Sequence, residues 1–319
     1  MIQISVVVPV FNEDESLPEL TQWINRVMQA NAYTYEVLLI NDGSTDRSWE
    51  VIQELSASNT ALKGINFTRN YGKSAALDAG FKRCSGEVVI TMDADLQDSP
   101  DEIPGLYAMI KGGLDVVSGW KKERHDPISK TIPSKFFNGV TRWISGIQLN
   151  DFNCGLKAYR NKVVKNIHIY GEMHRYIPLL AKWNGFSKIG EKVVAHQARK
   201  YGYSKFGLER FLNGFLDLIS VSFVHRYKKK PMHFFGLLGT LSFLTGFAIT
   251  AWLIIQKIYG LSQGIKVREV VDQPVFFLAL VALVIGAQLF LTGFIAELIT
   301  SNQAKEPEYK IDEEINLDF

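Results

Sequence analysis

The sequence predicts an α/β domain with a mostly parallel sheet, followed by two helices long enough to cross a membrane. From Met1 to about Tyr203, short β-branched apolar runs alternate with amphipathic runs, which is typical of strands joined by crossover helices. Polar or acidic residues follow the ends of the first four expected strands. Two long segments near the C-terminus, 234–256 and 273–296, contain no charged residue.

The elements follow one another in a regular order. The continuous apolar run 4–10, ended by Asn12, predicts a buried strand. Apolar residues then recur at helical spacing and predict a first helix, at Leu17, Leu20, Ile24, Val27 and Met28. We expect further strands at 36–40, 64–67 and 87–92, and further helices at 46–55 and 74–82.

The C-terminal part has the pattern of a membrane anchor. Segment 206–224 places polar residues at spacings of three or four against an apolar face, which predicts a helix in the membrane interface, with a core-facing helix as the alternative. The two apolar segments, of 23 and 24 residues, would each extend roughly 35 Å as helices, enough for a hydrocarbon core of about 30 Å. A buried helical hairpin is the alternative. Gly286 and Gly293 would let these helices approach closely.

Charge predicts how the chain is placed in the membrane. Basic residues precede the first span, at Arg226, Lys228, Lys229 and Lys230, which favours the cytosol for that flank. An even number of spans returns the acidic end to the same side. The N-terminus lacks the basic start and cleavage site of a signal peptide. We expect a cytosolic domain, an amphipathic juxtamembrane segment, two transmembrane helices and a partly disordered cytosolic tail, at 1–205, 206–230, 231–300 and 301–319 respectively.

Composition excludes several functional classes. The net charge of +2 gives no basic excess for a nucleic-acid partner. The two cysteines, Cys84 and Cys154, exclude a disulfide framework, fit a reducing compartment and have no zinc-site spacing. No Gly-x-Gly-x-x-Gly follows the first strand, which disfavours a dinucleotide-binding dehydrogenase.

The chemically suggestive residues follow the strands. Asn12-Glu13, Asp42-Gly43-Ser44, Arg69-Asn70 and the cluster Asp93–Asp98 come after the first, second, third and fourth strands. In parallel sheets, ligands bind outside the carboxyl ends of the strands. We therefore expect one crevice at that edge of the sheet.

The aspartate cluster predicts a divalent cation site. Asp93 and Asp95 are two residues apart after a buried strand, and Mg²⁺ or Mn²⁺ typically uses one or two carboxylates with substrate phosphates. Such an ion would neutralise charge on a diphosphate leaving group. We expect Asp98 and Asp101-Glu102 instead to cap the next helix and charge its first turn.

Several motifs together resemble the family 2 glycosyltransferases, which have the Rossmann-like GT-A fold. The motifs are Val6–Glu13, Asn41–Asp46, Arg69–Lys73, Met92–Asp98, Asp151–Lys157 and Gly202–Lys205. More narrowly, the chain resembles polyisoprenyl-phosphate glycosyltransferases, such as dolichol-phosphate mannose synthases and, with its two spans, the bacterial bactoprenol glucosyltransferases. The resemblance covers almost the whole chain and does not specify the sugar.

The resemblance implies a donor site. The nucleoside would contact Pro9, Glu13 and Asp42, and the metal would be held or supported by Asp93, Asp95 and Gln97. Arg69 or Lys73 would lie near the donor phosphates; a structural ion pair is the alternative for Arg69. His196 and the segment 199–205 would close over the diphosphate, with Ser204 donating a hydrogen bond.

The resemblance also implies an acceptor site for an isoprenoid phosphate. Its phosphate would be bound first by Lys121 and Arg124, with further cations at Arg142, Arg199, Lys200 and Lys205, although such charges also suit a solvated face. Glu172, His174 and Arg175 would line or support the acceptor sugar pocket, with a satisfied structural cluster as the alternative for His174. Asp151 is the usual candidate for a general base. We expect it instead to orient Lys157, an arginine or the metal, because the second pKa of a phosphate monoester is about 6 and the acceptor is already largely ionised.

The expected activity is an inverting transfer of one hexose to undecaprenyl or another polyprenyl phosphate at the cytosolic face of the bacterial inner membrane. UDP-glucose is the first donor expected, and GDP-mannose and an amino-arabinose donor stay open. Asp151, Asp95 and Arg124 are the expected catalytic residues. A processive synthase would need more spans and a Gln-x-x-Arg-Trp signature; a non-catalytic nucleotide- or lipid-binding scaffold is another alternative. We expect a homo-oligomer, a tetramer as in the bacterial relatives.

Overall fold

The computed structural model describes most of the chain. The described residues are 2–122, 138–143, 145–197, 200, 223, 227, 230–301 and 311–316. The chain divides into two compact units, Met1–Leu218 with Pro307–Phe319, and Ile219–Glu306. The predicted interface helix at 206–224 lies outside the described residues apart from Phe223.

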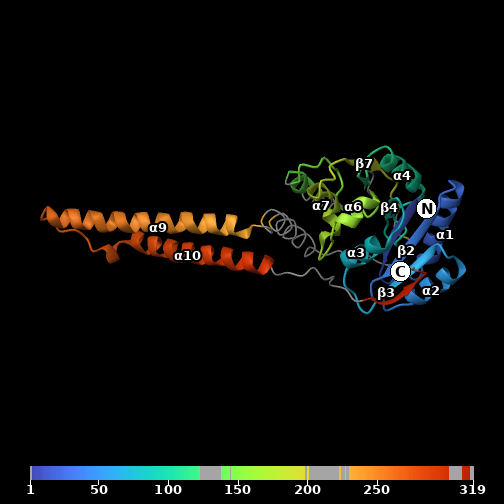
Figure 1. Cartoon of the computed structure of the whole chain (residues 1–319), viewed down its shortest axis with the longest axis horizontal. Helices are drawn as coiled ribbons and strands as arrows, with labels where there is room; N and C mark the ends of the chain where they lie inside the picture. The colour runs from blue at the N-terminus through green and yellow to red at the C-terminus, as the bar shows by residue number, and fades with distance from the viewer. Residues whose placement is uncertain are drawn as a thin grey trace. The chain divides into compact units, whose positions relative to one another are not determined.

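The first unit is built on a sheet in the order β7-β5-β6-β4-β1-β2-β3-β8 (Figure 1). Its strands are β1 (Ile4–Val10), β2 (Tyr35–Asn41), β3 (Leu62–Phe67), β4 (Val88–Thr91), β5 (Val116–Trp120), β6 (Lys157–Arg160), β7 (Ile189–Val193) and β8 (Ile311–Ile315). The pairs β1–β2, β1–β4, β2–β3 and β5–β7 are parallel. Only pairs involving β6 or β8 are antiparallel among the described strands. The predicted mostly parallel α/β sheet is confirmed.

Helices cover both faces of this sheet. The helices are α1 (Leu17–Ala30), α2 (Ser48–Ser58), α3 (Lys73–Arg83), α4 (Ile103–Lys111), α6 (Asn161–Asn166) and α7 (Ile177–Trp183), with short 3₁₀ helices η1 (Pro100–Glu102) and η2 (Met173–Tyr176). Side chains of α1, α2 and α4 share one core with alternate residues of β1. Helix α3 packs on the other face, where a Cβ at Gly80 would lie 2.4 Å from Cγ1 of Val7.

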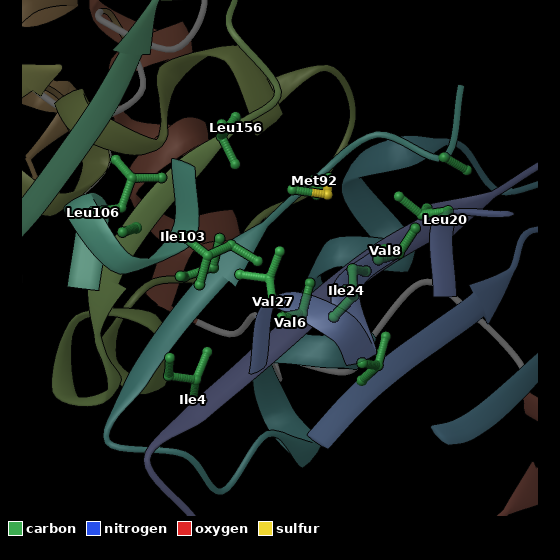
Figure 2. Packing of buried hydrophobic residues seen from close by; sticks show 14 of the residues in the cluster. Ile4, Val6, Val8, Leu20, Ile24, Val27, Met92, Ile103, Leu106 and Leu156 are labelled. Atoms are coloured by element: carbon green, nitrogen blue, oxygen red, sulfur yellow. The ribbon is translucent and has the colours of Figure 1, made fainter. Parts of the chain in front are cut away.

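The core follows from the period-two pattern of β1. Ile4, Val6 and Val8 point to the face that carries α1 and α4, where they meet Ile24 and Ile103 (Figure 2). All five are fully buried. Burial of each such side chain contributes roughly 1.5–3 kcal/mol, so this layer holds β1, and therefore the loop that follows it, in a fixed place.

The second unit is a pair of long apolar helices, α9 (Pro231–Ser262) and α10 (Pro274–Ser301), with a short 3₁₀ helix η3 (Val270–Asp272) between them. Both are long and apolar enough to cross a membrane. Their large side chains are mostly exposed, as at Leu237, Phe247 and Trp252, which is not the pattern of a buried soluble hairpin.

Glycines set the spacing of these two helices. A Cβ at Gly286 would lie 2.5 Å from the backbone nitrogen of Phe243, and one at Gly293 would lie 3.0 Å from Cβ of Phe235. The predicted close approach at Gly286 and Gly293 is therefore present.

The C-terminal end differs from the tail expected for 301–319. Residues Ile311–Ile315 form β8, which pairs antiparallel with β3 from Gly64↔Ile315 to Phe67↔Ile311. The outer edge of β3 would otherwise carry unpaired backbone groups. Strand β8 satisfies them and closes that edge of the sheet.

Candidate active site

A pocket lies where the first four strands end. It is lined by Pro9, Val10, Phe11, Glu13, Asp42, Asn70, Gly72, Lys73, Asp93, Ala94 and Asp95. These residues come from the end of β1, from the loops after β1, β2, β3 and β4, and from the start of α3. The expected crevice is present, and it holds most of the donor-site residues predicted from the sequence.

The loops after β1 and β2 are tied together. Asn12, in a left-handed conformation with φ 56°, donates its backbone N–H to Oγ of Ser44 at 2.9 Å and accepts from the N–H of Thr45 at 2.8 Å. The backbone N–H of Glu13 donates to Oγ of Ser48 at 2.9 Å. These bonds hold Glu13 at the mouth of the pocket.

Asp42 connects the loop after β2 with the start of α3. Its carboxylate accepts from the N–H of Tyr71 at 2.7 Å and from that of Gly72 at 2.9 Å. Burial raises the pKa of Asp42 to about 6, although these two hydrogen bonds act in the opposite direction. Gly43 beside it has φ 65°, and a Cβ there would lie 2.2 Å from the carbonyl carbon of Arg69. Only glycine allows the two loops to meet so closely.

Asp93 is surrounded by lysines. It forms an ion pair with Nζ of Lys73 at the first position of α3. Burial alone would raise the pKa of Asp93, but Lys73, Lys121 and Lys157 outweigh it and lower the value to about 2. The carboxylate also packs on Gly155, where a Cβ would lie 2.6 Å from Cγ of Asp93. Asp93 is therefore a fixed anion whose charge is already partly balanced.

Asp95 has a different environment. It lines the same pocket, and its Oδ1 accepts from the backbone N–H of Gln97 at 3.2 Å across Leu96, which has φ 59°. Gln97 does not line the pocket, and its carbonyl accepts from the N–H of Gln197 at 3.0 Å. In the structure Gln97 therefore supports Asp95 through its backbone.

The donor set fits a hard divalent ion that relies on its substrate. Asp93 and Asp95 present carboxylates to one pocket, and no group of three His, Cys, Asp or Glu side chains suited to a metal occurs in the described part of the chain. Mg²⁺ and similar ions usually take one or two carboxylates and complete their shell with water and phosphate oxygens. The pair is sufficient for that mode of binding.

The predicted helix cap at Asp98 is wrong. Ser99 caps η1 by accepting the N–H of Asp101, and Asp101 and Glu102 lie in its first turn as expected. Asp98 is instead fully buried, with its Oδ1 2.8 Å from Nζ of Lys121. Strand β5 ends beside the aspartate cluster, so Lys121 reaches the carboxylate of Asp98. The local sequence pattern alone assigns this carboxylate to a helix start.

Asp151 and Lys157 are buried residues of the segment that leads into β6. Asp151 is 1% exposed and its Oδ1 accepts from the N–H of Asn153 at 3.0 Å. Lys157 is also buried and donates to the carbonyl of Cys154. Burial lowers the pKa of Lys157, and Lys73 adds to this effect, while Asp151 and Asp93 act in the opposite direction. Asp151 and Lys157 are therefore within electrostatic reach of each other.

His174 supports the start of α3. Its Nδ1 lies 3.1 Å from Oγ of Ser74, and its backbone N–H donates to the same oxygen at 3.1 Å. Burial, with Lys73 and Arg175 nearby, lowers the pKa of His174 well below its usual value, so the ring is neutral near pH 7. Arg175 lies 3.6 Å from Glu172. The local pattern gave no signal for Ser74, the partner that makes His174 a support for α3.

The remaining predicted residues lie away from the pocket or outside the described part. The guanidinium of Arg69 stacks 4.4 Å above the ring of Tyr71, and Lys200 pairs with Glu19 at 2.6 Å. Four predicted site residues lie outside the described residues: Arg124, Arg199, Ser204 and Lys205.

A mostly parallel sheet that presents two carboxylates and a lysine at its strand ends is the arrangement of a GT-A glycosyltransferase. The sequence profile of glycosyl transferase family 2 matches residues 5–173. The chain is 36% identical over 302 residues to dodecaprenyl-phosphate galacturonate synthase of Rhizobium johnstonii, covering 93% of this chain and 88% of that protein. This chain belongs to glycosyl transferase family 2 and is a glycosyltransferase.

Solved structures show the same fold. Mannosyl-3-phosphoglycerate synthase from Rubrobacter xylanophilus matches with a TM-score of 0.58 at 14% identity, over 70% of this chain and 75% of that one. Glucosyl-3-phosphoglycerate synthase from Mycobacterium tuberculosis, solved with Mn²⁺ and UDP-glucose, matches with a TM-score of 0.53 at 19% identity, over 70% and 79%. The family membership sets aside the alternative of a non-catalytic scaffold.

Proposed function

We propose that this enzyme transfers one hexose, with inversion, from a nucleotide-sugar donor to a polyprenyl phosphate and releases a nucleoside diphosphate. The observation that carries the proposal is a single pocket with Glu13 and Asp42 among its lining residues and Asp93, Asp95 and Lys73 beside them, in a chain with two apolar helices. The name of the Rhizobium johnstonii relative, a dodecaprenyl-phosphate galacturonate synthase, supports the lipid acceptor.

The pocket suits the two ends of a nucleotide sugar. Carboxylates only accept hydrogen bonds, so Glu13 and Asp42, with Pro9 near the end of β1, match ribose hydroxyls and a base N–H. Lys73, at the first position of α3, would share its charge between Asp93 and the diphosphate. A divalent ion, Mg²⁺ or Mn²⁺, would be held by Asp93 and Asp95, with Gln97 supporting Asp95; when bound, it supplies positive charge to the leaving diphosphate.

The acceptor phosphate needs cations rather than a base. Its second pKa is about 6, so near pH 7 it already carries the negative charge that attacks the sugar. We assign Asp151 the role of holding Lys157 in place, so that catalysis rests on positioning and charge stabilisation. Lys121, Arg124, Arg199 and Lys205 are the acceptor-phosphate candidates, with Ser204 as a hydrogen-bond donor to the diphosphate and Arg69 as a second candidate beside the donor phosphates.

The sugar has several candidates. UDP-glucose was expected from the sequence, with GDP-mannose and an amino-arabinose donor as alternatives. The relative's name adds a uronic acid, galacturonate. The proposal is therefore a nucleotide-linked hexose, with glucose and galacturonate as the two sugars to test first.

The place of the reaction follows from the membrane helices. We propose that residues 231–300 anchor the enzyme in the bacterial inner membrane, with 206–230 in the interface and 1–205 and 301–319 on the cytosolic side. The basic residues at Lys228, Lys229 and Lys230 support that orientation. We further propose a homo-oligomer, a tetramer, because two spans form a thin anchor that can pack against copies of itself.

The test is transfer of radiolabel to undecaprenyl phosphate in detergent. Purified enzyme is incubated with UDP-glucose, UDP-galacturonate, GDP-mannose or an amino-arabinose donor, with EDTA, Mg²⁺ or Mn²⁺. Label should enter the lipid phase from one donor only when metal is present, and Asp95→Ala should abolish it. Asp101→Asn, an exposed aspartate of the same segment outside the pocket, should leave it unchanged. Lipid labelling that survives EDTA, or no lipid label from any donor, would contradict the proposal.

A further inference from the structure

We infer that Glu191, on β7, is a positioning residue that fixes the Asn150–Asp151 turn and thereby sets the place of Asp151. This inference rests on the proposed function, in which Asp151 acts beside the transferring centre. The sequence gives no signal for it, because Glu191 is one charged residue in an edge strand about forty residues from the turn it binds.

The carboxylate of Glu191 makes three hydrogen bonds to this turn. Its Oε1 accepts from the backbone N–H of Asn150 at 2.7 Å and from that of Asp151 at 3.1 Å. Its Oε2 accepts from Nδ2 of Asn150 at 2.7 Å. A carboxylate accepts and never donates when ionised, and hydrogen bonds to a charged group are about twice as strong as neutral ones. One carboxylate therefore accepts all three of these hydrogen bonds from the turn.

The opposite side of the turn is bound by the neighbouring strand. Ser118 on β5 lies directly opposite Glu191 in the β5–β7 register, and its Oγ donates to the carbonyl of Asp151 at 3.1 Å. Two residues that face each other across adjacent strands thus bind the N–H and the C=O of the same residue. The sheet itself determines where the backbone of Asp151 lies.

A third segment completes this support. Nδ2 of Asn138 donates to the carbonyl of Asn150 at 2.9 Å, and its Oδ1 accepts from the N–H of Phe152 at 3.3 Å. Asp151 and Phe152 are both essentially unexposed, and buried backbone groups need partners. The side chains of Glu191, Ser118 and Asn138 supply such partners and together fix the turn.

The position of the turn matters to the site because the chain runs on from it to a residue that contacts Asp93 of the pocket. Gly155 follows and packs on the carboxylate of Asp93, and Lys157, which lies within electrostatic reach of Asp151 and Asp93, begins β6. A shift of the turn would move Asp151 relative to both. Misplacement by about 1 Å is enough to slow an enzyme by about a hundredfold.

The first experiment measures position without activity. Hydrogen exchange of the full-length enzyme in detergent is compared between the wild type and Glu191→Gln. In the variant an amide N–H₂ faces the Asn150 donors, so exchange should rise in peptides that cover 150–153. The control, Glu36→Gln, removes a different carboxylate, one that is buried and accepts from backbone and side-chain donors, and should leave those peptides unchanged. Unaltered exchange at 150–153 in Glu191→Gln would overturn the inference, whether or not transfer is detected.

The second experiment asks whether Glu191 acts through Asp151. Glu191→Gln should lower kcat by roughly 10- to 100-fold and change KM for the donor less than about threefold, because the nucleoside contacts lie elsewhere. The double variant Asp151→Asn/Glu191→Gln should be no slower than Asp151→Asn alone. If the two factors multiply, Glu191 acts independently of Asp151 and the inference fails. Glu191→Asp and Asn150→Ala are milder variants that keep part of the network, should Glu191→Gln fail to fold.

Discussion

The Nζ of Lys121 lies 2.8 Å from Oδ1 of Asp98, a side chain with no exposure to solvent. The pair joins the end of β5 to the end of the aspartate cluster. The backbone of Asp98 also forms an isolated bridge with His196. The lysine proposed for the acceptor phosphate is therefore already held by a buried counter-ion, which fixes it at the edge of the site.

Asp98→Asn should destabilise the first unit. Removal of one partner leaves the half-buried ammonium of Lys121 without its counter-ion, and breaking a buried pair in this way costs about 3–5 kcal/mol. In thermal unfolding of the detergent-solubilised enzyme, the Tm should fall by at least about 6 °C. The double variant Asp98→Asn/Lys121→Met should recover part of the loss. An unchanged Tm for Asp98→Asn would show that the pair contributes nothing to the fold.

Lys73→Met should slow transfer with little effect on stability. The lysine is about one-third exposed. In the proposed function it lies beside the leaving diphosphate, and loss of one such stabilising group costs about 10²–10³-fold in kcat. Lys73→Arg keeps the charge and should retain more activity. Lys82→Met, which removes an exposed lysine paired with Asp78 on the same helix, is the matched control. Equal kcat values for Lys73→Met and Lys82→Met would contradict a role at the diphosphate.

Donor binding should weaken at mildly acidic pH because of Asp42. Burial raises its pKa to about 6, so the carboxylate is ionised and accepts hydrogen bonds above that pH and becomes protonated below it. Nucleotide affinity, measured calorimetrically without acceptor, should therefore fall about tenfold per pH unit below pH 6. Asp42→Asn should bind weakly with a flatter pH profile. A wild-type profile that stays level from pH 7 to pH 5 would exclude Asp42 as an ionised acceptor.

Glu36 should support the fold in a pH-dependent way without contributing to transfer. Burial alone would raise its pKa, but hydrogen bonds from Lys63, Ser5 and Ser85 outweigh burial and lower the pKa. A carboxyl with a lowered pKa stabilises the folded state above its ordinary pKa of 4.5, and this stabilisation is lost as the pH falls through the lowered value.

Glu36→Gln should therefore lower the Tm at pH 7, with a difference from wild type that shrinks toward acidic pH and kcat unchanged. Charged hydrogen bonds of this kind contribute about 1.5–3 kcal/mol each. A Tm difference that is constant from pH 7 to pH 3, or one that grows on acidification, would show that the ionised carboxyl is not the source of the stability.

The arrangement of the donor pocket was largely predictable from the sequence. The apolar run of β1 and the helical spacing in α1 are local patterns, and each depends only on neighbouring residues. Parallel strands end at the same edge of a sheet, so Glu13, Asp42 and Asp93 could be placed together without coordinates. Gly286 at the close contact of α9 and α10 is a similar case, because small residues mark helix contacts in membranes.

The pairing of residues that are distant in the sequence became visible only in the folded structure. Asp98 sits beside a helix start and looks like a cap, yet the register of β5 gives it Lys121. The segment Ile311–Ile315 holds three acidic residues and looks like a solvated tail, yet the open edge of β3 makes it a strand. Glu191 binds a turn about forty residues away. Ser118, which faces Glu191 across the sheet, binds the same turn. Local sequence fixes the type of element and the residues at its ends, whereas pairings across the sheet depend on long-range packing, which no single segment encodes.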